Sequence, residues 1–328
     1  MHGYLYHLLC SPLLPNNKHL TRSAMATDPM TDLLPILVHA IPTVQSYHHL
    51  DNIVQGNAEG TRILARHSSS ISEEDAVLNE IHDGADELID VKETELFLKR
   101  VDASAYMHKS WTDMRRTLVY LRTEVRFYNE FVPLFENENH LKAMIPKCHH
   151  ADYDLNGLVD DDSPATDVNA PPSIGEDNLK QSVQGKGGHI LLQSLAPSHG
   201  YYQTSPLTID ESLLCLKAVA RLHASAWGKT PLLNKVSDRL SNAGGSYHLK
   251  FRNPKELQNI VSSWKAFRSS FAGFEETKIL EKDSVVALGQ RVFDMAEYVS
   301  DQLSPKVEDE HATLVHGDYK SMVSLALS

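Results

Sequence analysis

The chain has 328 residues, of which 41% are hydrophobic and 23% are charged, and these are ordinary values for a globular protein. The length exceeds one hydrophobic core and predicts two lobes. The net charge of −12 argues against binding to nucleic acid or to an anionic membrane, and no apolar run approaches the ~18–20 residues of a membrane span. The three cysteines are far apart, which predicts no disulfide framework and favours a reducing, cytoplasmic location.

The first 30 residues predict a disordered leader. Residues 1–27 contain no acidic side chain, but they include Lys18 and Arg22 and an apolar stretch from Tyr4 to Leu14. This composition resembles a weak signal or transit segment, so a targeting segment is the alternative.

The next part of the chain predicts strands followed by one helix. Residues 53–66 have the pattern of two strands joined by a glycine turn from Gly56 to Gly60, and residues 95–101 predict a further strand. Between residues 114 and 128, apolar side chains recur at spacings of 4, 3, 4 and 3, which predicts an amphipathic helix that ends at Pro133.

Two more strands are expected on either side of a polar segment. Residues 142–150 and 188–195 are the apolar stretches. Residues 152–188 between them are rich in aspartate, proline and glycine, which predicts a disordered hairpin insertion.

The rest of the chain predicts helices. Thr208 and Glu211 form a possible capping box before a helix that ends near Trp227, and Pro254 and residues 285–299 mark two later helices. A strand-rich lobe over residues 31–195 and a helical lobe over residues 196–328 give an α+β fold with two lobes.

Four fragments suggest phosphate chemistry when they are taken in chain order. Backbone N–H groups of the turn that includes Gly56, Asn57 and Gly60 can face phosphate oxygens. Lys99 can contact the phosphates as a point charge, and Glu124 on the helix can pair with Lys99. Taken singly, these residues are typical of a turn, a solvated lysine and a surface glutamate.

The fourth fragment is His316-Gly317-Asp318, which follows the apolar residues 313–315. A turn after a strand exposes its aspartate, and this carboxylate can accept the proton of a substrate hydroxyl.

The chain resembles the CHK kinase-like family, also called ecdysteroid kinase-like, which is related to choline kinases and aminoglycoside phosphotransferases. The resemblance runs from about Ile53 to Met322, and residues 124–133, 190–195, 220–224 and 314–321 carry it. It implies a bilobal kinase-like fold and ATP-dependent phosphorylation of a hydroxyl group on a small molecule, with ATP and Mg²⁺ as cofactors.

The resemblance also implies a role for individual residues. Lys99 would contact the phosphates with Glu124 as its partner, and Gln193, Ser194 and Leu195 would form the hinge beside the adenine. Asp318 would be the catalytic base, and Lys320 would contact the γ-phosphate.

The chain departs from the family pattern at its metal site. Val323 stands where the family has a metal-binding asparagine, and the ten residues after Asp318 include no second metal-binding aspartate. We therefore expect little or no catalysis from the chain as written, either because it is a truncated product or gene model, or because it is a pseudokinase that binds a nucleotide or a protein partner. The acceptor alcohol is not specified.

Other candidate residues have simpler explanations. The metal-ligand types in one short stretch are Cys148, His149, His150, Asp152 and Asp154. Neighbouring residues of a strand face opposite sides, so His149 and His150 would not both reach one ion, which disfavours a zinc site. His223 is expected to be a hydrogen-bonded core histidine rather than a catalytic one, and Trp227 and Trp264 are expected in the core.

Overall fold

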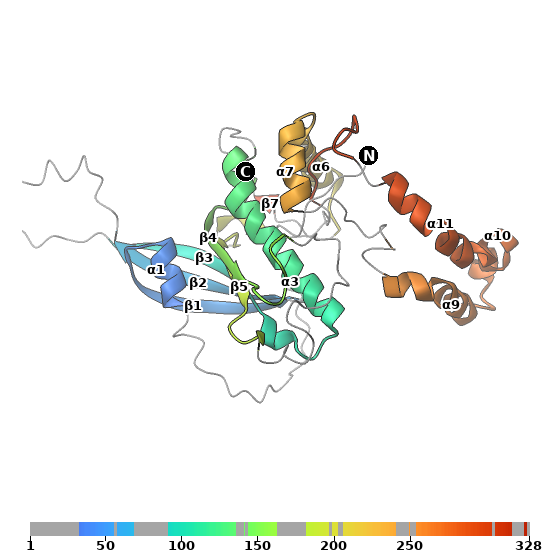
Figure 1. Ribbon diagram of the computed structural model, residues 1–328, viewed down its shortest axis with the longest axis horizontal. Coiled ribbons are helices and arrows are strands. Elements are labelled where there is room, and N and C mark those ends of the chain that lie inside the picture. The colour runs from blue at the N-terminus through green and yellow to red at the C-terminus, as the bar shows by residue number, and fades with distance from the viewer. Residues whose placement is uncertain are drawn as a thin grey trace, which may run out of the picture.

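The computed structural model describes residues 33–55, 58–68, 91–135, 141, 144–162, 182–196, 199–202, 206–240, 249, 254–303, 306–316 and 325–326. The strands of a sheet lie in the N-terminal part of the chain, and long helices follow in the C-terminal part (Figure 1). The predicted α+β, kinase-like bilobal class is confirmed.

The sheet has five strands in the order β1-β2-β3-β5-β4, and every neighbouring pair is antiparallel. The strands are β1 (Val44–Gln55), β2 (Ala58–Ser68), β3 (Val91–Asp102), β4 (Cys148–Asp154) and β5 (Gly187–Gln193). All the strands predicted from the sequence are present, although β4 begins six residues later than predicted.

The two faces of the sheet are covered by different helices, because successive residues of a strand point to opposite sides. Helix α1 (Leu34–Ala40) packs on one face, which we call the outer face, through an apolar cluster. This cluster consists of Leu33, Leu37, Ile63, Ala65, Leu96, Leu98 and Leu191. Helix α3 (Trp111–Arg126) packs on the other face, which we call the inner face, and joins the larger core.

Helix α3 is the predicted amphipathic helix. The Ser110 side chain caps its first turn by accepting from the backbone N–H of Asp113. The helix continues without a break into a π-helical turn, η3 (Phe127–Phe131), and a 3₁₀ turn, η4 (Val132–Phe135), which contains Pro133. A short 3₁₀ turn, η2 (Ala103–Tyr106), precedes α3.

The C-terminal helices begin with α6 (Ile209–Ala226), where Thr208 and Glu211 form the predicted capping box. Helix α7 (Thr230–Arg239) follows. The helices α6 and α7 supply Leu222, Leu233 and Val236 to the same core as α3.

Helices α9 (Pro254–Ser270) and α11 (Leu288–Leu303) lie side by side and away from the sheet (Figure 1). The turn η7 (Glu275–Glu281) and helix α10 (Asp283–Val286) connect them. The single helix predicted over residues 285–299 is therefore divided. The indole N–H of Trp264 donates to the Val285 carbonyl oxygen at 2.8 Å, and a Cβ atom at Gly289 would lie 2.8 Å from the Trp264 Cβ atom.

A two-stranded antiparallel sheet pairs β6 (Tyr201–Tyr202) with β7 (Leu325–Ala326). Within the described residues, no helix is both long enough and apolar enough to cross a membrane.

The prediction that residues 152–188 form an unpacked insertion is wrong at both of its ends. Strand β4 extends to Asp154, and the side chains of Leu155, Leu158 and Val159 are buried in the core. Val183 is buried in the same core, and residues 163–181 lie outside the described residues. The burial of these side chains could not be predicted from composition, because the few apolar residues are interspersed with aspartates.

The expected burial of Trp227 is also wrong, since 54% of this residue is exposed. Its indole N–H donates to the Glu310 carbonyl oxygen at 2.9 Å, so the ring lies along the surface of the chain.

Candidate functional site

The inner face of the sheet brings Lys99 and Glu124 together. Lys99 lies in β3, and its ammonium group donates to the carboxylate of Glu124 on α3. The Glu124 side chain is 7% exposed, so the lysine supplies the charge that this nearly buried carboxylate needs. The pairing expected from the sequence is present, whereas the role of the pair in phosphate binding stays a prediction.

Gly60 lies beside Lys99 but not in the turn where the sequence placed it. It belongs to β2, where it pairs with Lys99 on one side and with Ile53 of β1 on the other. The turn predicted from Gly56 to Gly60 is therefore too long. Gly56 and Asn57 lie between the two strands and outside the described residues.

The predicted hinge begins at Gln193, the last residue of β5. The backbone N–H of Gln193 donates to the Lys147 carbonyl oxygen at 2.8 Å. The backbone N–H of Ser194 donates to the Glu95 carbonyl oxygen at 3.2 Å, and its hydroxyl donates to Glu95 Oε1 at 3.1 Å. The Ser194 carbonyl oxygen accepts from His199 Nδ1 at 3.3 Å.

The three hinge residues differ in how many of their polar groups already form hydrogen bonds within the protein. The polar groups of Ser194 are used within the protein, and the side chain is buried. Within the described part of the chain, no hydrogen bond uses the backbone of Leu195.

Glu95 is a residue that the motifs did not single out and that the structure places against the hinge. Its carboxylate is nearly buried and accepts from the Ser194 hydroxyl and from Arg62, whose Nη1 lies 3.3 Å from Oε1. Glu95 and Lys99 point to the same face of β3, and at about 3.3 Å per residue they are separated by about 13 Å. The inner face of β3 therefore carries a charged side chain at each end of this stretch, one beside the hinge and the other at Lys99.

Arg62 forms a second contact on this face. It donates to both carboxylate oxygens of Asp51 at 2.6 Å in a fork-like arrangement. The hydrogen bond to Asp51 raises the pKa of the Arg62 guanidinium above its ordinary value. Alternation along β2 and β3 could have indicated the shared face of Arg62 and Glu95, but not the contact of Glu95 with the hinge.

The segment that leads to the predicted catalytic turn is held against α6. Leu314, Val315 and His316 are buried, and the Thr313 hydroxyl donates to the His223 carbonyl oxygen. Asp318 and Lys320 lie outside the described residues, so their roles stay predictions.

His223 is half-buried, and burial lowers the pKa of its imidazole. Its carbonyl oxygen, which accepts from Thr313, connects the motif at residues 220–224 with the segment before Asp318.

No group of three histidine, cysteine or acidic side chains among the described residues could hold a metal ion. The ring of His150 packs between the rings of His39 and His189, with centroid distances of 4.3 and 5.0 Å. Burial is the main cause that raises the pKa of the Cys148 thiol to about 12. A thiol with such a pKa is a poor metal ligand at neutral pH.

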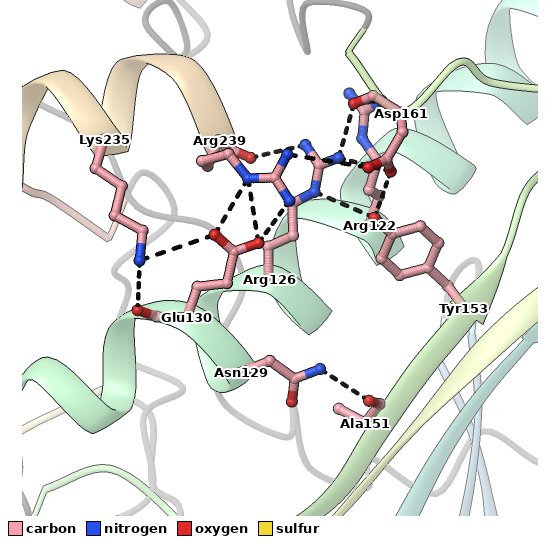
Figure 2. Close-up of polar contacts among 9 residues, drawn as sticks. All are labelled: Arg122, Arg126, Asn129, Glu130, Ala151, Tyr153, Asp161, Lys235 and Arg239. Carbon is pink, nitrogen blue, oxygen red and sulfur yellow. Dashed lines mark hydrogen bonds and ion pairs between the residues drawn. The ribbon is translucent and has the colours of Figure 1, made fainter.

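The motif at residues 124–133 makes a further set of contacts, beyond Glu124 (Figure 2). Arg126 and Glu130 reach α7 and Asp161, and the Asn129 amide donates to the Ala151 carbonyl oxygen of β4 at 3.0 Å. The motif thus joins the sheet, α3 and α7.

The model of the ecdysteroid kinase-like family matches residues 91–322, which is more than half of the chain. The protein therefore belongs to this family, and the resemblance inferred from the motifs is confirmed. Membership suggests a small-molecule phosphotransferase. No curated protein and no solved structure matches the chain.

Proposed function

We propose that the protein binds ATP on the inner face of its sheet and derives from phosphotransferases that act on a hydroxyl group of a small molecule. The observation that carries this proposal is the ion pair between Lys99 and Glu124. A buried carboxylate that holds a lysine on the face of a sheet presents a fixed positive charge, and such a charge suits the phosphates of a nucleotide.

The hinge supports the same placement. The backbone of Leu195 would contact the adenine, because the polar groups of Ser194 are used by Glu95 and His199. The separation of about 13 Å between Glu95 and Lys99 along β3 is suited to a ligand with a base at one end and phosphates at the other.

Asp318 is proposed as the base that accepts the proton of the acceptor hydroxyl, with Lys320 near the γ-phosphate. ATP would supply the phosphoryl group. The buried segment up to His316 and its contact with α6 would fix the backbone that precedes Asp318.

The residues present do not fit a magnesium site of the family type. Val323 is apolar and cannot coordinate a hard cation, which prefers oxygen ligands. Because losing one electrostatic element commonly costs about 10²–10³ in rate, we propose that the 328 residues transfer phosphate slowly or not at all.

The alternative is a pseudokinase that serves as a nucleotide-binding or protein-interaction module, and Val323 is the observation that favours it. The proposed function and the nucleotide-binding form of the alternative both predict binding of ATP without a requirement for Mg²⁺, whereas a module that serves only protein interaction does not. A cytoplasmic location and a lobe boundary near residue 195 are part of the same proposal.

The test measures ATP binding by calorimetry and thermal shift, with and without Mg²⁺. Lys99→Met should weaken ATP binding about 10–100-fold, because a charge-assisted contact is worth about 1.5–3 kcal/mol. Lys92→Met is the matched control, since Lys92 lies on the same strand, exposed and on the outer face.

Absence of ATP binding by the wild-type chain would refute the proposed site. Rapid transfer from Mg·ATP to a panel of small alcohols would refute the proposed loss of activity and leave the site intact.

A further inference from the structure

The end of α3 is fastened to the end of α7 by a group of charged side chains (Figure 2). We call it the clasp, and it consists of Arg126, Glu130, Asp161, Lys235 and Arg239. We propose that the clasp positions Glu124 against Lys99, so that Glu130 and Arg239 are positioning residues for the nucleotide site. This inference deepens the proposed function and rests on it.

Glu130 forms the α7 side of the clasp. The Arg239 guanidinium donates to the Glu130 carboxylate, with Nη2 2.7 Å from Oε1 and Nε 3.1 Å from Oε2. The Lys235 ammonium donates to the Glu130 carbonyl oxygen at 3.0 Å. Forked contacts between arginine and carboxylate fix orientation as well as distance. The hydrogen bond from Arg239 to Glu130 is the main cause that raises the pKa of the guanidinium.

Arg126 forms the centre of the clasp and is 4% exposed. Its Nη1 donates to the Arg239 carbonyl oxygen at 3.0 Å, which places a positive charge at the C-terminal end of α7. Its Nη2 lies 2.7 Å from both the Asp161 carbonyl oxygen and Oδ1. Because Asp161 is also held by the Tyr153 hydroxyl at 2.5 Å, the clasp reaches β4.

Glu124 and Arg126 are two residues apart in the same helix, so they move together. A helix rises about 1.5 Å per residue and is stiff over such a distance. A shift of the α3 end by about 1 Å would therefore also move the Glu124 carboxylate. Such a shift would weaken its contact with Lys99, because that contact acts only over a short distance.

The π-helical turn η3 carries Glu130, which is a clasp residue that contacts α7. Glu130 lies within η3, immediately after α3 ends, and both its side chain and its carbonyl oxygen face α7. Such turns are uncommon and often occur at functional sites. The contacts join residues that are 109 and 113 positions apart, so they depend on how the two parts of the fold meet.

The experiment measures the reactivity of Lys99 toward an amine-acylating reagent by mass spectrometry, with Lys92 as the internal reference. Glu130→Gln and Arg239→Ala should raise the labelling rate of Lys99 relative to Lys92 by about threefold or more, and Arg239→Lys should raise it less. ATP affinity should fall in the same order.

Two controls separate positioning from general stability. Asn234→Ala changes an exposed residue on α7 next to Lys235 and should leave Lys99 labelling unchanged. Leu37→Ala lowers stability through the outer cluster, so it should reduce the melting temperature without affecting Lys99 labelling.

The labelling readout needs no nucleotide, which keeps the two proposals apart. If wild-type protein does not bind ATP but the clasp variants still expose Lys99, the positioning role stands and the ATP site falls. If the variants lower the melting temperature as Leu37→Ala does, and Lys99 labelling stays within the scatter of wild type, the positioning role is overturned.

Discussion

The outer face of the sheet is held to α1 mainly by apolar side chains, whereas the inner face carries charged side chains beneath α3. On the outer face, Leu37, Ile63 and Leu96 form a sealed cluster. On the inner face, Glu124 and Glu95 are nearly buried, and each has a cationic partner. Buried charges are more costly to pack than apolar side chains, so their presence on the inner face supports the proposal that the nucleotide site lies there.

The comparison predicts that the outer face affects stability and not the site. Leu37→Ala should lower the free energy of unfolding by about 3 kcal/mol, because it removes a side chain that is 1% exposed and leaves a cavity. Denaturant unfolding measures this change, and calorimetry should show ATP affinity within twofold of wild type. A tenfold loss of affinity would show that the two faces are coupled.

The inner face should show the opposite behaviour. Lys99→Met should lower the free energy of unfolding by about 2 kcal/mol, because it leaves the Glu124 carboxylate buried without its partner. The double variant Lys99→Met/Glu124→Leu should recover most of this stability, because no charge is then buried. ATP affinity should stay low in both variants.

Equal stability of the single and the double variant would contradict this prediction. It would mean that solvent already screens the Glu124 carboxylate, and that the pair is not a buried charge kept for function.

A smaller effect is expected from His150 on the outer face as the pH falls. Burial, and then the neighbouring His39, lowers the pKa of His150 below its ordinary value of 6.5. Between the two pKa values the unfolded chain binds more protons than the folded one, so stability rises with pH in this window. The melting temperature should therefore fall when the pH is lowered from about 7.5 to 5.5.

His150→Gln should reduce this loss without removing it. Burial also lowers the pKa values of His149 and His223, so these residues contribute in the same direction. Thermal melts at matched ionic strength provide the measurement, and an unchanged pH slope in the variant would exclude His150 as a contributor.

Local patterns were sufficient for the elements whose signals lie within a few residues. The capping box of Thr208 and Glu211 and the apolar stripe of α3 depend on contacts three or four residues apart, so both could be predicted. The pair of Lys99 and Glu124 was expected because a family motif surrounds Glu124.

Other features depended on which strands and helices meet. The sequence predicts Gly60 in a turn although it lies in β2, because a glycine in a strand has the same local pattern as a glycine in a turn. The polar composition around Leu155 and Leu158 predicts an insertion, because their burial depends on a core built from distant parts of the chain.

The sequence by itself determined the family, the helical and strand character of most segments, and the identity of the central ion pair. Only the tertiary structure decided which groups share the inner face. The hydroxyl of Ser194 reaches Glu95 across 99 residues, and Arg126 reaches the end of α7 across 113. The physical reason is that strand register and helix packing bring such distant residues together, whereas local sequence periodicity carries no information about contacts between distant segments.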